Sequence, residues 1–190
     1  IRAEHFLPAL ERGMSLHDAE IDAIASNNDD PTFGNVIEAY DAAGGMLART
    51  ELVFGMLCAA ENTPELQALQ ERAMPLLAAH YDRILLDERL FARVKELYDR
   101  RGALDLDDVQ LRLLEKTYRR FVRAGALLDA GRKARLKEIN GELALAAVKF
   151  GNNLLAENNR FEMELTADEM AGLPSDVQEL AREKARERGK

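Results

Sequence analysis

The segment GMSLHDAEID, residues 13–22, contains the most suggestive pair of potential metal ligands in the chain. His17 lies three residues before Glu20, and this spacing places both side chains on one face of a helix. Structural and catalytic zinc sites take at least three protein ligands, so these two residues alone do not make such a site. We therefore expect His17 and Glu20 to lie on an exposed helix face and not to bind metal.

The other potential catalytic residues also lack partners with suitable spacing. The three histidines, at positions 5, 17 and 80, include no pair four residues apart, so the H-E-x-x-H zinc motif is absent. No sequence neighbour suggests a partner for His80, which is predicted to be a structural histidine, either buried or exposed. The acid pairs at 29–30 and 107–108 stand where helix caps are expected. The sequence thus predicts no catalytic residue and no metal ligand.

Cys58 is the single cysteine of the chain, which excludes an internal disulfide. Its neighbours Met56, Leu57, Ala59 and Ala60 are apolar, and this setting favours a buried thiol in a reducing compartment over a catalytic cysteine. No basic segment followed by an apolar stretch, the pattern of a signal peptide, follows Ile1. We therefore expect a cytoplasmic location.

Composition and charge narrow the class of protein. The 190 residues are 47% hydrophobic and 32% charged, which is typical of one globular domain. The 26 basic and 34 acidic residues give a net charge of −8, which disfavours nucleic acid as a partner. The longest uncharged apolar run, residues 52–60, is shorter than the roughly 20 residues of a membrane-spanning helix. No membrane segment is expected.

The elements that must position these residues are predicted to be helices, because apolar residues recur at spacings of three and four along most of the chain. Gly44 and Gly45 should interrupt the second helix, after which its apolar stripe resumes through Leu52 and Val53. The predicted helices cover about 6–25, 32–60, 63–86, 87–101, 107–124, 129–158 and 175–188.

The longest predicted helix carries Leu136, Leu143 and Phe150 at seven-residue intervals, the spacing of a packed helix bundle. The alternation in RFEMELT, residues 160–166, is typical of a short strand. We therefore predict an all-α fold, a multi-helix bundle of about seven helices with one long helix and one possible short strand.

Several long segments of the chain resemble the N-terminal region of bacterial peptidyl-dipeptidases, members of the thimet oligopeptidase and neurolysin family of zinc metallopeptidases. The similarity covers nearly the whole chain in order, although none of its segments is a catalytic signature. The segments are EHFLPALERGM, DPTFGNVIEAYDAAGGMLART, LLDERLFARVKELYDRR, LDLDDVQLRLLEKTYRRFVRAGALL and LKEINGELALAAVKFGNNLLAENNRFEMEL, followed by AGLP.

This resemblance implies that residues 1–190 are the N-terminal helical domain of a larger peptidase. In that family the zinc-binding H-E-x-x-H helix and the third ligand, a glutamate, lie far downstream, in a C-terminal catalytic domain of the same chain. The N-terminal part forms one wall of a channel that admits short unstructured peptides. The fragment alone is then expected to be inactive and to hold no cofactor, whereas the full-length parent binds one zinc ion. No catalytic or zinc residue of the family maps onto this chain, and its substrate-binding residues stay unassigned.

A free-standing helical module that binds a partner helix in an apolar groove is the alternative interpretation. The encoding reading frame separates the two hypotheses. A frame that continues to an H-E-x-x-H segment supports the peptidase, and one that stops at Lys190 supports the module.

Overall fold

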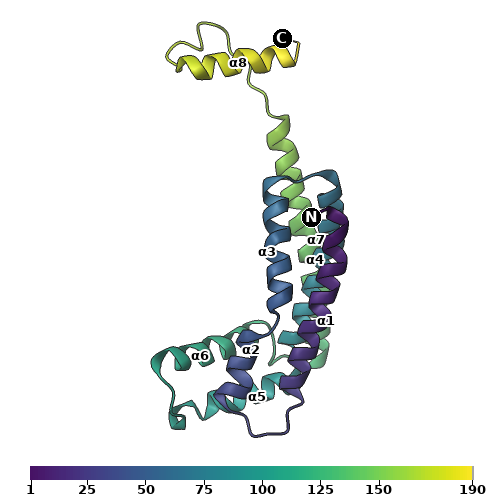
Figure 1. Cartoon of the computed structure of the whole chain (residues 1–190), viewed down its shortest axis with the longest axis vertical. Coiled ribbons are helices and arrows are strands. Elements are labelled where there is room, and N and C mark those ends of the chain that lie inside the picture. The colour runs from purple at the N-terminus through teal and green to yellow at the C-terminus, as the bar shows by residue number, and fades with distance from the viewer. Residues whose placement is uncertain (190) are drawn as a thin grey trace. The chain divides into compact units, whose positions relative to one another are not determined.

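The computed structural model describes residues 1–189 and is all-α, which confirms the predicted fold class (Figure 1). Within this range it has seven helices of 12 residues or more, a four-residue α2, three short 3₁₀ or π turns and no β-strand. The chain forms two compact units, one comprising Ile1–Asn152 and the other beginning at Asn153.

The first helix, α1 (Phe6–Ala25), follows a 3₁₀ turn at Ala3–His5 and has the predicted bounds, 6–25. It packs lengthwise against α3 and α4. Its buried residues recur at helical spacing and include Phe6, Leu10, Ile21 and Ile24. The helix is long enough to contribute to both apolar cores of the first unit, described below.

The second predicted helix is divided, as the two glycines suggested. The Thr32 hydroxyl accepts a hydrogen bond from the Asn35 amide and starts a π turn, Phe33–Glu38, followed by α2 (Ala39–Ala42). Ala43 is extended and Gly44 is left-handed, with φ 77°, before α3 (Gly45–Ala60) begins. Glycine adopts this left-handed conformation without the steric cost that a side chain would add.

The stretch Phe33–Ala60 is long and apolar enough, by length and composition alone, to cross a membrane. The core helix of a soluble protein can meet the same criterion. Here the left-handed Gly44 interrupts the stretch, and its residues Val36, Ile37, Leu47 and Phe54 are buried within the first unit.

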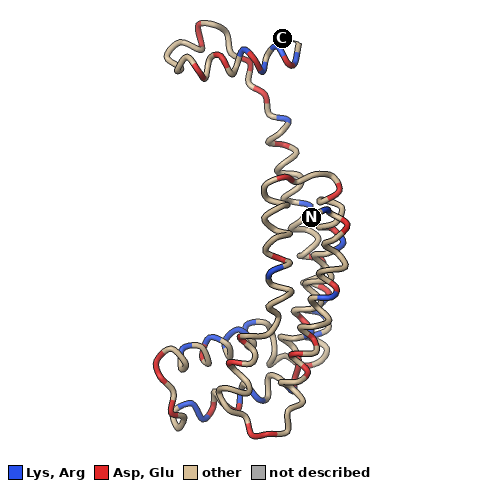
Figure 2. Tube along the Cα trace, in the orientation of Figure 1, with Lys and Arg blue, Asp and Glu red and all other residues tan. Residues whose placement is uncertain are grey.

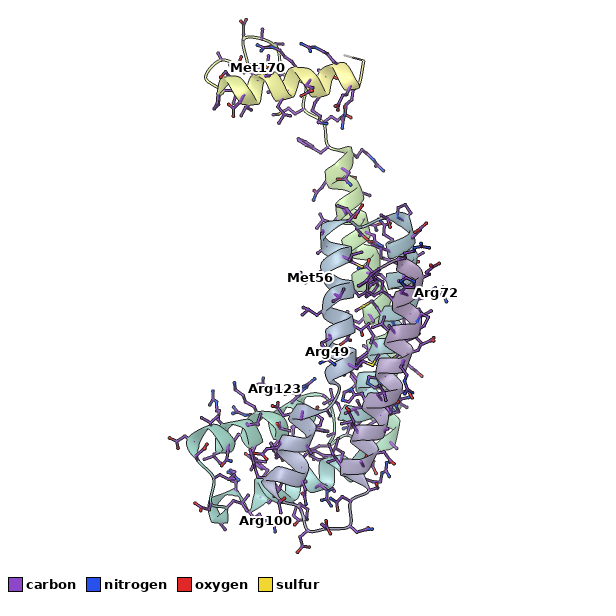
Figure 3. All side chains as sticks on the ribbon, in the orientation of Figure 1. Arg49, Met56, Arg72, Arg100, Arg123 and Met170 are labelled. Atoms are coloured by element: carbon purple, nitrogen blue, oxygen red, sulfur yellow. The ribbon has the colours of Figure 1, made fainter. Side chains whose placement is uncertain are left out.

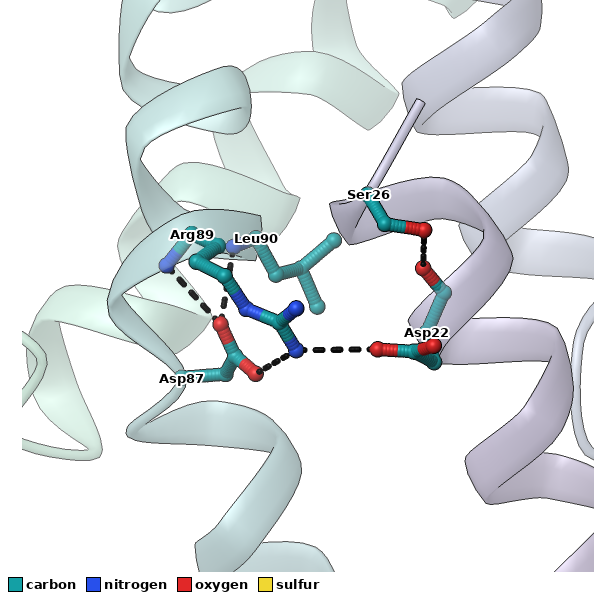
Figure 4. A network of polar contacts seen from close by, with 5 residues as sticks. All are labelled: Asp22, Ser26, Asp87, Arg89 and Leu90. Carbon is teal, nitrogen blue, oxygen red and sulfur yellow. Dashed lines mark hydrogen bonds and ion pairs between the residues drawn. The ribbon is translucent and has the colours of Figure 1, made fainter. Parts of the chain in front are cut away.

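The next three helices begin at side-chain caps. Thr63, Asp87 and Asp107 accept backbone hydrogen bonds at the starts of α4 (Pro64–Leu85), α5 (Glu88–Asp99) and α6 (Asp108–Arg123). Asp87 accepts from the amides of Arg89 and Leu90 at 2.8 and 3.0 Å (Figure 4). The predicted capping by the acid pair at 107–108 is confirmed. For the pair at 29–30 it is wrong, because Thr32 caps the following turn.

The first unit contains two apolar cores. One lies between the C-terminal half of α1, the 33–43 segment, α5 and α6, and its most buried residues are Val36, Ile37, Leu90, Val94, Leu97, Leu114 and Phe121. The other lies between the N-terminal half of α1, α3 and α4, and contains Phe6, Leu10, Leu47, Phe54, Cys58, Leu66, Leu69, Ala73 and Leu77. These two cores hold the histidine-bearing helices α1 and α4 in place.

The apolar stripe predicted to pack along α7 (Ala130–Arg160) is largely exposed, so that prediction is wrong. Leu143 and Phe150 are 63% and 72% exposed. Within the first unit, polar contacts attach this helix: Lys133 Nζ lies 2.9 Å from Glu88, and the Asn140 amide donates to Asp82 at 2.7 Å. The seven-residue period identifies an apolar face, but the period does not show that other residues of the first unit cover it.

A similar exposed apolar face lies on α3. Leu52 and Val53, predicted to continue the buried stripe, are exposed, whereas Leu47, Phe54 and Cys58 are buried. Figure 3 shows Met56, which is 64% exposed, pointing away from the neighbouring helices. Helix α3 is apolar on both its buried and its exposed faces, which explains why its sequence did not reveal the inward face.

We expect these exposed faces to make the 190-residue chain self-associate, because monomeric proteins rarely expose large contiguous apolar patches. Light scattering should give a mass that rises with protein concentration, and the double variant Leu52→Lys/Met56→Lys should remain monomeric. The matched control Glu71→Lys changes the charge by the same +2 at an exposed polar residue of α4, and this variant should associate as the wild type does. A strictly monomeric wild type at high concentration would contradict the expectation.

The second unit contains α8 (Ser175–Glu187) and a preceding irregular segment. Residues 160–166, predicted as a possible short strand, form none. Arg160 ends α7, and the residues after it have no hydrogen-bonded neighbouring strand in the described structure. Thr166 and Glu169 cap each other's amides, at 2.8 and 3.3 Å. A hollow of about 450 Å³, lined by residues including Phe161, Met163 and Leu165, lies within this unit.

Candidate functional site

His17 of α1 and His80 of α4 are in direct contact in the interior of the first unit. The His17 Nδ1 atom lies 3.0 Å from the His80 Nε2 atom. Both residues are buried, His17 being 8% exposed and His80 1% exposed. The prediction that His17 lies on an exposed helix face is therefore wrong. His80, for which the sequence suggested no partner, is buried and has several.

Asp18 and Arg83 extend the histidine pair toward the surface. The Asp18 carboxylate contacts His80 Nδ1 at 3.2 Å and Arg83 at 2.5 Å. We assign the His80 proton to Nδ1, so that this ring donates to Asp18 and accepts from the Nδ1–H group of His17. The Arg83 Nη2 atom also lies 3.1 Å from His80 Nδ1, but with this tautomer it makes no hydrogen bond to the ring. The Arg83 guanidinium then donates to the second Asp18 oxygen. Two helices that are distant in sequence are thus joined by one chain of polar contacts.

Burial keeps both rings neutral near pH 7. It lowers the pKa of His17, against the opposing influence of the carboxylates of Glu20, Asp18 and Glu51. Burial also lowers the pKa of His80, and the neighbouring His17 and Arg83 act in the same direction, whereas Asp18 opposes it. Two imidazoles 3.0 Å apart also resist taking up a second proton.

The break between α2 and α3 is fitted around the His17 ring. A Cβ atom placed on Gly44 would lie 2.9 Å from His17 Nδ1 and Cε1. The Gly44 amide donates to Glu20, at 2.6 Å. The first helix therefore fixes the position of the break through two of the residues that the sequence singled out, His17 and Glu20, but not by joint metal binding.

A histidine–histidine–aspartate chain can relay protons, but catalysis also requires contact with a substrate. His80 is 1% exposed, so a substrate cannot reach it in this conformation. Cys58 is buried as predicted, and burial raises the pKa of its thiol, which favours the unreactive neutral form. Over residues 1–189, no group of three or more His, Cys, Asp or Glu side chains is arranged to hold a metal ion.

Beside this network lies a surface hollow of about 310 Å³, between α1 and the α4–α5 junction. Its charged residues pair with one another: Arg89 contacts Asp22 at 3.0 Å and Asp87 at 3.4 Å (Figure 4). Exposed pairs of this kind contribute little to stability. The opposite charges along α1 and at the start of α5 were the only sequence signal for this contact, and such a signal does not identify partners by itself.

Comparison with known proteins shows which proteins this chain resembles. No family model matches it. It is 40% identical over 190 residues to the dipeptidyl carboxypeptidase of Escherichia coli (strain K12). The matched region is 100% of this chain and 28% of that protein. It is 38% identical over 186 residues to the dipeptidyl carboxypeptidase of Salmonella typhimurium, covering 97% of this chain and 27% of that protein.

A more distant similarity connects the chain with oligopeptidase A of Salmonella typhimurium, at 24% identity over 186 residues, or 97% of this chain and 27% of that protein. The chain thus spans little more than a quarter of the length of these relatives. The recognised resemblance is confirmed: the chain is homologous over its full length to the N-terminal portion of bacterial dipeptidyl carboxypeptidases.

Proposed function

We propose that this chain is the non-catalytic N-terminal domain of a zinc-dependent peptidyl-dipeptidase or oligopeptidase that hydrolyses short peptides. The similarity to dipeptidyl carboxypeptidase over the full chain, at 40% identity, carries the proposal. The exposed apolar faces of α3 and α7 are consistent with a domain that packs against further protein. In the parent, the C-terminal catalytic domain of the same polypeptide is the proposed partner of this domain.

The proposed role of this domain is to form one wall of the peptide channel. Zinc would activate the attacking water in the parent, but the described residues contain no cluster suited to hold it. We therefore assign the zinc ligands to another part of the parent and no chemical step to this chain. Its helices would act by excluding folded substrates and by contacting extended ones. Because Cys58 is free and buried, we also propose a cytoplasmic location.

The purified 190-residue chain provides the direct test. Elemental analysis after dialysis should find no stoichiometric zinc, and an internally quenched peptide should not be cleaved with or without added zinc. One tightly bound zinc ion per chain, or turnover well above the buffer rate, would contradict the proposal. The reading frame gives an independent test: continuation into an H-E-x-x-H segment supports the peptidase, and a stop at Lys190 supports a free-standing interaction module.

A further inference from the structure

Helix α6 carries five basic residues on one face. Arg112, Lys116, Arg119, Arg120 and Arg123 are separated by three or four positions or are adjacent, and all five are exposed. We call these five residues the α6 basic face. Figure 2 shows the blue segments recurring along this helix.

Almost none of this charge is neutralised within the protein. Arg119 lies 3.5 Å from Glu115, but the other four residues have no ion pair or side-chain hydrogen bond in the described part of the chain. The five side chains alone line a surface hollow of about 380 Å³. A hollow lined entirely by cations, in a protein with a net charge of −8, favours occupation by an anion.

Stabilisation of helix α6 itself explains only part of this arrangement. Arg120 and Arg123 stand in the last turn of α6, where cations interact favourably with the helix dipole. Arg112 and Lys116 lie earlier, and like charges at i, i+4 destabilise a helix by roughly 0.2–0.5 kcal/mol per pair. The helix dipole therefore explains Arg120 and Arg123 but not Arg112 and Lys116.

The dimensions and surroundings of the face indicate the class of ligand. From Arg112 to Arg123 the helix rises about 16 Å, the length of roughly five residues of extended peptide. The nearby aromatic rings of Tyr98 and Tyr118 stack on each other, with centroids 3.8 Å apart. Arg101 lies over the Tyr98 ring and Phe91 stacks on Tyr118, so these rings are already occupied and do not form a platform for a nucleobase. The overall negative charge also disfavours a long polyanion.

We propose that the α6 basic face binds the carboxylates of a short acidic peptide in an extended conformation. Two or three Asp or Glu side chains spaced along about five residues match the length of the basic face. This binding needs no metal and no hydrolysis. The proposal therefore stands or falls separately from the peptidase assignment.

Fluorescence anisotropy with labelled hexaglutamate and hexaglutamine peptides tests the proposal on the 190-residue chain. The wild type should bind hexaglutamate at least tenfold more tightly than hexaglutamine, and 300 mM salt should weaken the binding strongly. The variant Lys116→Gln/Arg123→Gln should lose at least tenfold in affinity. Glutamine forms helices about as well as these residues, and circular dichroism should show unchanged helicity.

The matched control removes two exposed, unpaired cations elsewhere, in the variant Arg72→Gln/Lys137→Gln. Figure 3 shows Arg72 and Arg123 on different helices. The control should change the affinity less than twofold. Four results would overturn the proposal: no binding by the wild type, equal binding of the two peptides, equal losses in both variants, or tighter binding of a six-nucleotide oligothymidylate than of hexaglutamate.

Discussion

Replacement of Gly44 by alanine is expected to lower the free energy of unfolding by about 2–5 kcal/mol. Gly44 has φ 77°, and an alanine in this left-handed conformation costs about 1–2 kcal/mol. The new Cβ would also lie 2.9–3.0 Å from three atoms of the His17 ring. That ring is held by its contact with His80 at 3.0 Å. It therefore cannot move aside without breaking the buried pair, and overpacking adds about 1–3 kcal/mol.

Gly45 provides an unusually close control. A Cβ on Gly45 would meet nothing within 4 Å, and its φ is not positive. Because this residue begins α3, Gly45→Ala should leave the stability unchanged or raise it by about 0.4–1 kcal/mol. Urea denaturation of both variants and the wild type measures the difference. Similar losses in the two variants would show that the helix break does not depend on the left-handed residue or on the His17 ring.

The helix boundaries were predictable because their causes are local. A cap such as Thr63 or Asp107 satisfies amides two or three residues away, and Gly125, with φ 94°, ends α6. These signals depend only on residues close together in the sequence. The break at Gly44 was predictable for the same reason.

The inward faces and the buried network were not predictable, since they depend on partners far along the chain. His17 and His80 are 63 positions apart, and no sequence pattern around either residue identifies the other as its partner. Phe150 shares a seven-residue period with Leu136 and Leu143 but is 72% exposed. Periodicity identifies an apolar face and does not say which surface covers it.

The alternation at 160–166 shows a further limit of sequence patterns. Alternating apolar residues fit a strand, but a strand also requires a neighbour that completes its hydrogen bonds. No such neighbour is present among residues 1–189. A pattern can therefore be compatible with a strand where the described chain supplies no sheet.

The buried histidine pair should make the protein less stable as the pH falls from 7.5 to 5. Burial lowers the pKa of both His17 and His80 below the value of about 6.5 for an unfolded chain. As the pH falls through 6.5, the unfolded chain takes up protons before the folded one, so stability decreases toward the lower, folded pKa values. The loss is at most about 2 kcal/mol for each histidine by pH 5, since one pKa unit corresponds to 1.36 kcal/mol.

Urea denaturation at intervals of half a pH unit measures this slope. Glutamine cannot be protonated, so His17→Gln/His80→Gln should flatten the curve between pH 7.5 and 5, whatever its stability at pH 7.5. His5→Gln removes an exposed histidine and should follow the wild-type curve. If the double variant does not fold, nuclear magnetic resonance of the wild-type imidazole Cε1–H groups gives the same information, because two should titrate below pH 6.5. A wild type whose stability is constant or rises toward pH 5 would mean that the pair is protonated within the fold, with Asp18 and the surrounding carboxylates outweighing burial.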